Sequence, residues 1–91
     1  MNVADRKFRS APDVHSRTFD GELVLVDLAR GDYFGLNELG ARLWQGVHAG
    51  MTPREVVDSI RDFDVDREKL LADVVALATE LVQRGLVVPV E

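Results

Sequence analysis

The chain has 91 residues, a formal net charge of −5 and no cysteine, and 46% of its residues are hydrophobic. This length fits one small globular domain with a modest core. The missing cysteines exclude disulfides, thiolate catalysis and cysteine-based metal sites. The acidic balance disfavours a nucleic-acid partner, because affinity for a phosphate backbone depends on Lys and Arg.

The first residues predict neither a signal peptide nor a membrane segment. Residues 1–11 have no apolar run, and no stretch approaches the ~20 apolar residues that span a bilayer. We therefore expect a cytoplasmic protein with no membrane partner. Val3 and Phe8 are the main apolar anchors of residues 1–11, so we expect a flexible lead-in there and a single domain over residues 12–91.

Two extended runs, 14–19 and 22–28, flank the pair Asp20-Gly21. An Asp-Gly pair in this position is typical of a two-residue hairpin turn, because both turn residues need a positive φ. The turn fixes the register of the hairpin. The predicted pairs are Phe19 with Glu22, Arg17 with Val24, and His15 with Val26.

A second tight turn is expected at residues 29–31, with Gly31 in the left-handed conformation and a third strand at residues 32–36. Counting back across a three-residue turn places Phe34 beside Val26, and Tyr33 on the opposite face with Leu25. The second strand is apolar on both faces, which predicts a central strand covered on both sides. Strands 14–19 and 32–36 are then edges with unpaired backbone groups.

Three helices are expected after the strands. Asn37 caps the first, Thr52-Pro53-Arg54-Glu55 forms a capping box for the second, and Asp66 caps the third. Gly85 ends the third helix near Arg84 in a Schellman-type turn. The sequence therefore predicts an α+β fold of order β-β-β-α-α-α.

The third helix carries two apolar stripes, whereas a surface helix normally needs one. The second stripe must cover something else, and a groove between it and strand 32–36 suits an extended peptide. The simpler alternative is that both stripes complete the core. The stripes are Leu70, Val74, Leu77 and Leu81, and Leu71, Val75, Ala78 and Val82.

No active site is evident in the sequence. His15 and His48 have no companion at metal-ligand spacing, and the run of alternating acids at residues 62–66 lacks the other positions of a calcium loop. No serine has a recognisable base partner, and no glycine-rich phosphate loop occurs. We expect a protein that is not an enzyme and has neither metal nor cofactor.

Short motifs in fixed order make the sequence resemble the PqqD-like family, and within it the stand-alone leader-recognition domains of lasso-peptide (RiPP) pathways. The resemblance spans about residues 12–88. It rests on Asp13-Val14, the strand 22–28, Gly31-Asp32-Tyr33-Phe34-Gly35-Leu36-Asn37, Leu43-Trp44, Thr52-Pro53-Arg54-Glu55-Val56-Val57, Asp64-Val65-Asp66 and Leu81-Val82-Gln83-Arg84-Gly85-Leu86.

The resemblance implies a winged-helix-like fold without catalytic activity. It also implies that a precursor's leader segment adds to strand 32–36 against the third helix, for delivery to a separate leader-cleaving protease and a lasso cyclase. Apart from the resemblance, Arg30, Arg67 and Lys69 could meet acidic peptide residues, but the pattern favours solvated surface charges. The candidate peptide-binding residues are Val26, Arg30, Asp32, Tyr33, Phe34, Gly35, Leu36, Lys69, Leu70, Leu71, Asp73, Val74, Val75, Leu77 and Ala78.

Two other function classes stay open on the sequence. The order of elements permits a winged-helix DNA-binding regulator, but the charge and the missing basic stripe argue against one. Asp58-Ser59-Ile60 faintly resembles the attachment site of an acyl carrier protein. That serine falls inside a predicted helix rather than at a helix start, which argues against a carrier.

Overall fold

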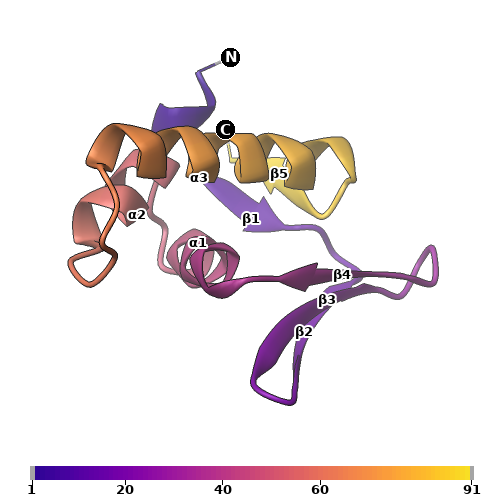
Figure 1. Cartoon of the computed structure of the whole chain (residues 1–91). Coiled ribbons are helices and arrows are strands. Elements are labelled where there is room, and N and C mark those ends of the chain that lie inside the picture. The colour runs from indigo at the N-terminus through magenta and orange to yellow at the C-terminus, as the bar shows by residue number, and fades with distance from the viewer. Residues whose placement is uncertain (1, 91) are drawn as a thin grey trace.

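The computed structural model describes residues 2–90. A three-stranded sheet precedes three α-helices, as predicted, and a second small sheet pairs the first strand with the last (Figure 1). The fold is therefore α+β, with the three-stranded order β2-β3-β4 and the separate pair β1-β5. The elements are η1 (Val3–Asp5), β1 (Phe8–Ser10), β2 (Val14–Phe19), β3 (Glu22–Asp27), β4 (Asp32–Leu36), α1 (Glu38–His48), α2 (Pro53–Ser59), α3 (Arg67–Gln83) and β5 (Val87–Pro89).

The first hairpin has the predicted register. Phe19 pairs with Glu22, and the pairing continues to Val14 opposite Asp27. Asp20 and Gly21 both have positive φ, at 50° and 82°, which is the conformation of a type I′ turn.

The second hairpin differs from the prediction by one residue. Phe34 pairs with Leu25 and Tyr33 pairs with Val26, so the predicted faces of Phe34 and Tyr33 are wrong. The loop has four residues rather than three, because β3 ends at Asp27 and Leu28 lies in the loop instead of the strand. The Asp27 carboxylate accepts hydrogen bonds from the backbone N–H groups at positions 29 and 30 of this loop. A one-residue change in loop length exchanges the two faces of the returning strand.

The sheet β2-β3-β4 is covered on one face only, which corrects the expectation for the central strand. Leu25 is fully buried on the inner face. The outer face carries three exposed large apolar side chains around the half-buried valines of β3. These side chains are Phe19 (62% exposed), Leu28 (65%) and Tyr33 (79%).

The helix ends follow the predicted signals. The Asn37 side chain accepts a hydrogen bond from the Gly40 N–H at 2.8 Å, and α2 begins with a complete capping box. Gly85 has a φ of 72°, and the Leu86 N–H donates to the Leu81 carbonyl at 2.9 Å in the expected Schellman geometry.

Helix α3 presents one continuous buried stripe, and its membership differs from the prediction. Leu70, Val74, Ala78 and Leu81 are buried, whereas Leu77 is half-buried. Ala78 therefore belongs to the core and Leu77 lies beside it. Spacings of three and four residues both occur along a buried helical face, so the sequence pattern alone left this choice open.

The N-terminal segment packs in the domain, in contrast to the expected flexible lead-in. Phe8 is only 3% exposed, and β1 pairs with β5 in antiparallel register. Asp5 in η1 forms a salt bridge with Arg54 of α2, with Oδ1 and Nε 2.7 Å apart. Burial of Phe8 holds this segment in the core, together with the strand pairing.

Candidate functional site

Strand β4 is an edge strand, and its free backbone groups can be assigned from the register. A type I′ turn makes Phe19 and Glu22 a hydrogen-bonded pair, and bonded and non-bonded pairs alternate along antiparallel strands. The odd-numbered residues of β3 therefore bond to β4. They pair with Asp32, Phe34 and Leu36.

It follows that the other two residues of β4, Tyr33 and Gly35, direct their N–H and C=O groups away from the sheet. These four groups form the free edge of β4. A further strand placed along this edge would find donors and acceptors at the regular spacing of a sheet ladder.

Helix α3 lies to one side of this edge, and α1 closes its far end (Figure 1). A hollow of about 360 Å³ lies between β4 and α3. Gly40 permits the close approach of the elements here, because a Cβ on it would stand 3.0 Å from Leu36 Cδ2 and 3.1 Å from Leu77 Cδ2. The lining residues are Phe34, Gly35, Leu36, Asn37, Leu39, Asp73 and Leu77.

A second hollow, of about 270 Å³, lies at the other end of β4, against the C-terminal end of α3. The Arg84 guanidinium stands over the Phe34 ring at 4.7 Å from its centroid, and Arg84 Nε donates to Glu80 at 3.1 Å. Arg30 Nη1 donates to the Arg84 carbonyl at 3.3 Å, which fastens the β3–β4 loop to the helix end. The lining residues are Asp27, Arg30, Asp32, Tyr33, Phe34, Gln83, Arg84 and Leu86.

We call the two hollows and the free edge between them the β4–α3 groove. One wall offers unpaired backbone groups, and the other offers Leu77 together with charged side chains at its two ends. Phe34 lines both hollows and forms the floor between them. Such a groove can pair with an extended chain and receive every second side chain of it.

The chain matches one known protein family over most of its length. Residues 22–87 match the family model described as coenzyme PQQ synthesis protein D (PqqD). The chain belongs to the PqqD family. No curated protein matches it significantly.

Two solved structures resemble this PqqD-family chain closely. One is lasso peptide synthetase B1 complexed with the leader peptide, which is 30% identical with a TM-score of 0.84, covering 91% of this chain and 99% of that one. The other is TbiB1 in complex with the TbiA(beta) leader peptide, which is 34% identical with a TM-score of 0.77, covering 87% and 93%. The winged-helix-like fold implied by the sequence resemblance thus has close relatives among solved structures.

About half of the predicted site residues meet at the β4–α3 groove. They come from the β3–β4 loop, from β4 and from one flank of α3. Sequence reasoning missed Arg84, although it lies seven residues after Leu77 and therefore on the same flank of the helix. The predicted residues that line the groove are Arg30, Asp32, Tyr33, Phe34, Gly35, Leu36, Asp73 and Leu77.

The other predicted residues lie elsewhere. Leu70, Val74 and Ala78 are buried in the core, and Val26 is half-buried on the outer face of the sheet. Lys69 is exposed beside the groove, with its Nζ 3.6 Å from Asp73 Oδ2.

Leu71 and Val75 are half-buried on the opposite flank of α3, about 120° or more around the helix from Leu77. The groove flank of α3 therefore runs through Asp73, Leu77 and Arg84 rather than through the second apolar stripe. The predicted part of Leu71 and Val75 in peptide binding stays a prediction.

Charges on α3 are largely paired, which leaves no basic stripe on this helix. Arg67 bonds to Asp58, Lys69 lies against Asp73, and Arg84 bonds to Glu80. The resolved pKa shifts belong to residues away from the groove. A hydrogen bond from Arg54 lowers the pKa of Asp5, and one from Arg42 lowers the pKa of Asp62.

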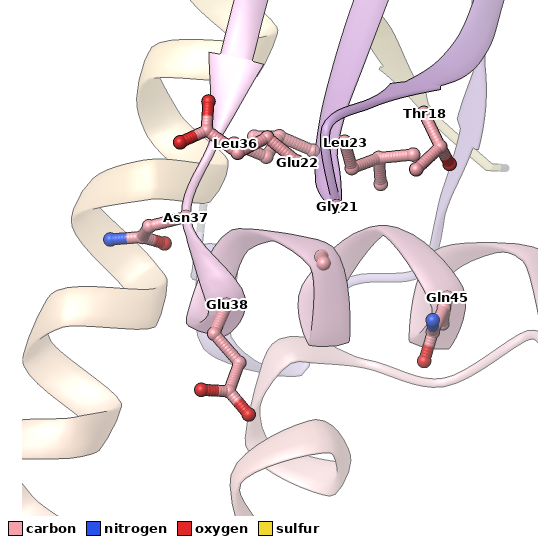
Figure 2. A pocket seen from close by; sticks show the side chains of 9 residues that line it. Thr18, Gly21, Glu22, Leu23, Leu36, Asn37, Glu38 and Gln45 are labelled. Atoms are coloured by element: carbon pink, nitrogen blue, oxygen red, sulfur yellow. The ribbon is translucent and has the colours of Figure 1, made fainter.

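A third hollow, of about 640 Å³, lies between the tip of the first hairpin and α1. Figure 2 shows the side chains that line it. Glu22 and Leu23 at the hairpin and Glu38 and Gln45 of α1 line it, and Leu36 connects it with the β4–α3 groove. Within residues 2–90 there is no group of three or more His, Cys, Asp or Glu placed to hold a metal ion. No helix of the same residues has the length and apolar character to cross a membrane.

Proposed function

We propose that this chain binds the leader segment of a ribosomally made precursor peptide in lasso-peptide biosynthesis. The leader adds as a strand to β4, within the β4–α3 groove. The observation that carries the proposal is the free edge at Tyr33 and Gly35 beside an apolar wall of α3. The two similar structures support it, because both contain a leader peptide.

Backbone and side chains have separate parts in this binding. Each new ladder hydrogen bond contributes about 0.5–1.5 kcal/mol net, whatever the peptide sequence. Sequence preference comes from alternate side chains that enter the two hollows against Phe34 and Leu77. Apolar peptide side chains fit the hollow of about 360 Å³ between β4 and α3, because Leu36, Leu39 and Leu77 provide its apolar surface.

The protein acts by binding alone in this proposal. It presents the precursor to a separate leader-cleaving protease, and a lasso cyclase then closes the product. The encounter takes place in the cytoplasm, where the precursor is synthesised. No cofactor or metal takes part.

Calorimetry with a synthetic leader tests the proposal. The probe is the leader of the precursor encoded nearest to this gene, and the matched control is the same composition in scrambled order. We expect one-to-one binding of the leader in the micromolar range or tighter, and no heat from the scrambled peptide. A folded monomer, verified by circular dichroism, that binds neither peptide would reject the proposal.

A further inference from the structure

Glycine at position 35 has no explanation within this chain. Gly35 is the fourth of the five residues of β4, and its φ is not positive. A Cβ placed on it would meet nothing within 4 Å. Glycine inside a strand lowers the free energy of unfolding by about 0.5–1 kcal/mol relative to alanine. Glycine at this position therefore destabilises the fold, and no contact within the chain requires it.

The surroundings of Gly35 show what its missing side chain exposes. Gly35 pairs with Val24, and its neighbours on the same outer face are Val26 and Tyr33. Tyr33 is 79% exposed, and Val24 is half-buried. The missing side chain therefore leaves an open position on the outer face, with Val24 on the neighbouring strand and Tyr33 two residues before it on β4. We call this open position the notch.

The notch opens onto the free edge of β4. Gly35 directs its N–H and C=O groups outward, so a strand that adds to β4 forms a bonded pair with Gly35. The partner residue then has its side chain on the outer face, about 4.5–5.5 Å away between Cβ positions. Diagonal neighbours such as Tyr33 stay within reach of an aromatic ring.

We propose that Gly35 is a specificity-determining residue, whose notch accepts one aromatic or large aliphatic side chain of the bound peptide. This inference rests on the proposed function and names the residue class that the groove selects. The side chain lies across Gly35 and covers Val24 and Tyr33, as aromatic residues cover glycines on neighbouring strands. The peptide residues on either side of it point the other way, towards α3.

A substitution at Gly35 separates this role from a structural one. We expect Gly35→Val to retain or raise the melting temperature, because valine favours strands and has open space there. Leader affinity should fall by tenfold or more, and Gly35→Ala should show a smaller loss. Ser16→Val in β2 is the matched control, and we expect it to leave affinity within twofold of the unsubstituted protein.

Alanine substitutions along the synthetic leader complete the test. At one aromatic or large aliphatic position of the leader, alanine should lower the affinity for the unsubstituted protein tenfold or more. The same substitution should lower the affinity for Gly35→Val less than twofold. Equal losses at that position with both proteins would overturn the inference, as would Gly35→Val binding with unchanged affinity. If the unsubstituted protein binds no leader, the proposed function fails first and the inference falls with it.

Discussion

The sheet has two edge strands, and they differ in what their free edges can do. Strand β2 forms the other edge, in a hairpin that projects from the rest of the fold (Figure 1). Its polar residues His15, Ser16, Arg17 and Thr18 are exposed. Polar and charged side chains of this kind discourage pairing with another strand. Strand β4 carries instead the apolar run Tyr33–Leu36 and lies beside α3.

The difference indicates that a selective peptide site needs a side-chain surface beside the unpaired backbone edge. Both edges offer backbone donors and acceptors, and backbone hydrogen bonds do not distinguish one peptide from another. Strand β4 has a second, apolar surface beside its edge, formed by Leu77 and its neighbours. We therefore expect selectivity to depend on the wall of α3 and on the outer notch, and basal affinity on the edge.

The wall of α3 gives the largest expected effect. Leu77→Glu places a charge in the groove that an apolar peptide side chain would bury, and we expect leader affinity to fall about 100-fold. Val75→Glu is the control on the opposite flank of the same helix, with an expected change within twofold. Calorimetry of both variants checks this, and a larger loss with Val75→Glu would move the site to the second apolar stripe.

The two edges can be compared with proline. Tyr33→Pro removes an outward N–H from β4 without breaking a bond to β3, and we expect about a tenfold loss of leader affinity. Ser16→Pro makes the same change on β2, where we expect no loss. Tyr33→Ala separates the side chain from the backbone group. Equal affinities of Tyr33→Pro and Tyr33→Ala would show that no backbone bond forms at this position.

A change far from both edges should leave binding unaltered. The hydrogen bond from Arg54 lowers the pKa of Asp5, so this carboxylate stabilises the fold above its unfolded pKa. The stabilisation is lost as the pH falls through the lower folded pKa. We expect Asp5→Asn to lower the melting temperature at pH 7, to match the unsubstituted protein at pH values below the lowered pKa of Asp5, and to bind the leader equally well. Melting curves across this pH range test the expectation, and a constant difference would contradict it.

Local signals were the part of the fold that the sequence predicted well. Asn37, the capping box at Thr52 and the stop at Gly85 each depend on a few neighbouring residues, and each has the expected geometry. The Asp20-Gly21 turn fixed the first hairpin for the same reason. The order of elements follows from these boundaries.

Features that depend on distant residues were missed. The strand pair β1-β5 joins three-residue segments from opposite ends of the chain, and neither segment has a pattern of its own. The register of β4 depends on a loop that the Asp27 side chain organises. The groove flank of α3 is set by which side meets β4. The sequence therefore named Leu77 without separating it from the buried stripe, and it missed Arg84.

The pairing of β1 with β5 has a consequence for how the domain can be joined to others. Because Phe8 lies opposite Pro89, the first and last strands lie side by side in a sheet separate from β4. An enzyme fused at either end, or at both, would leave the peptide edge uncovered. The domain can therefore be joined to another protein without any change to the β4–α3 groove.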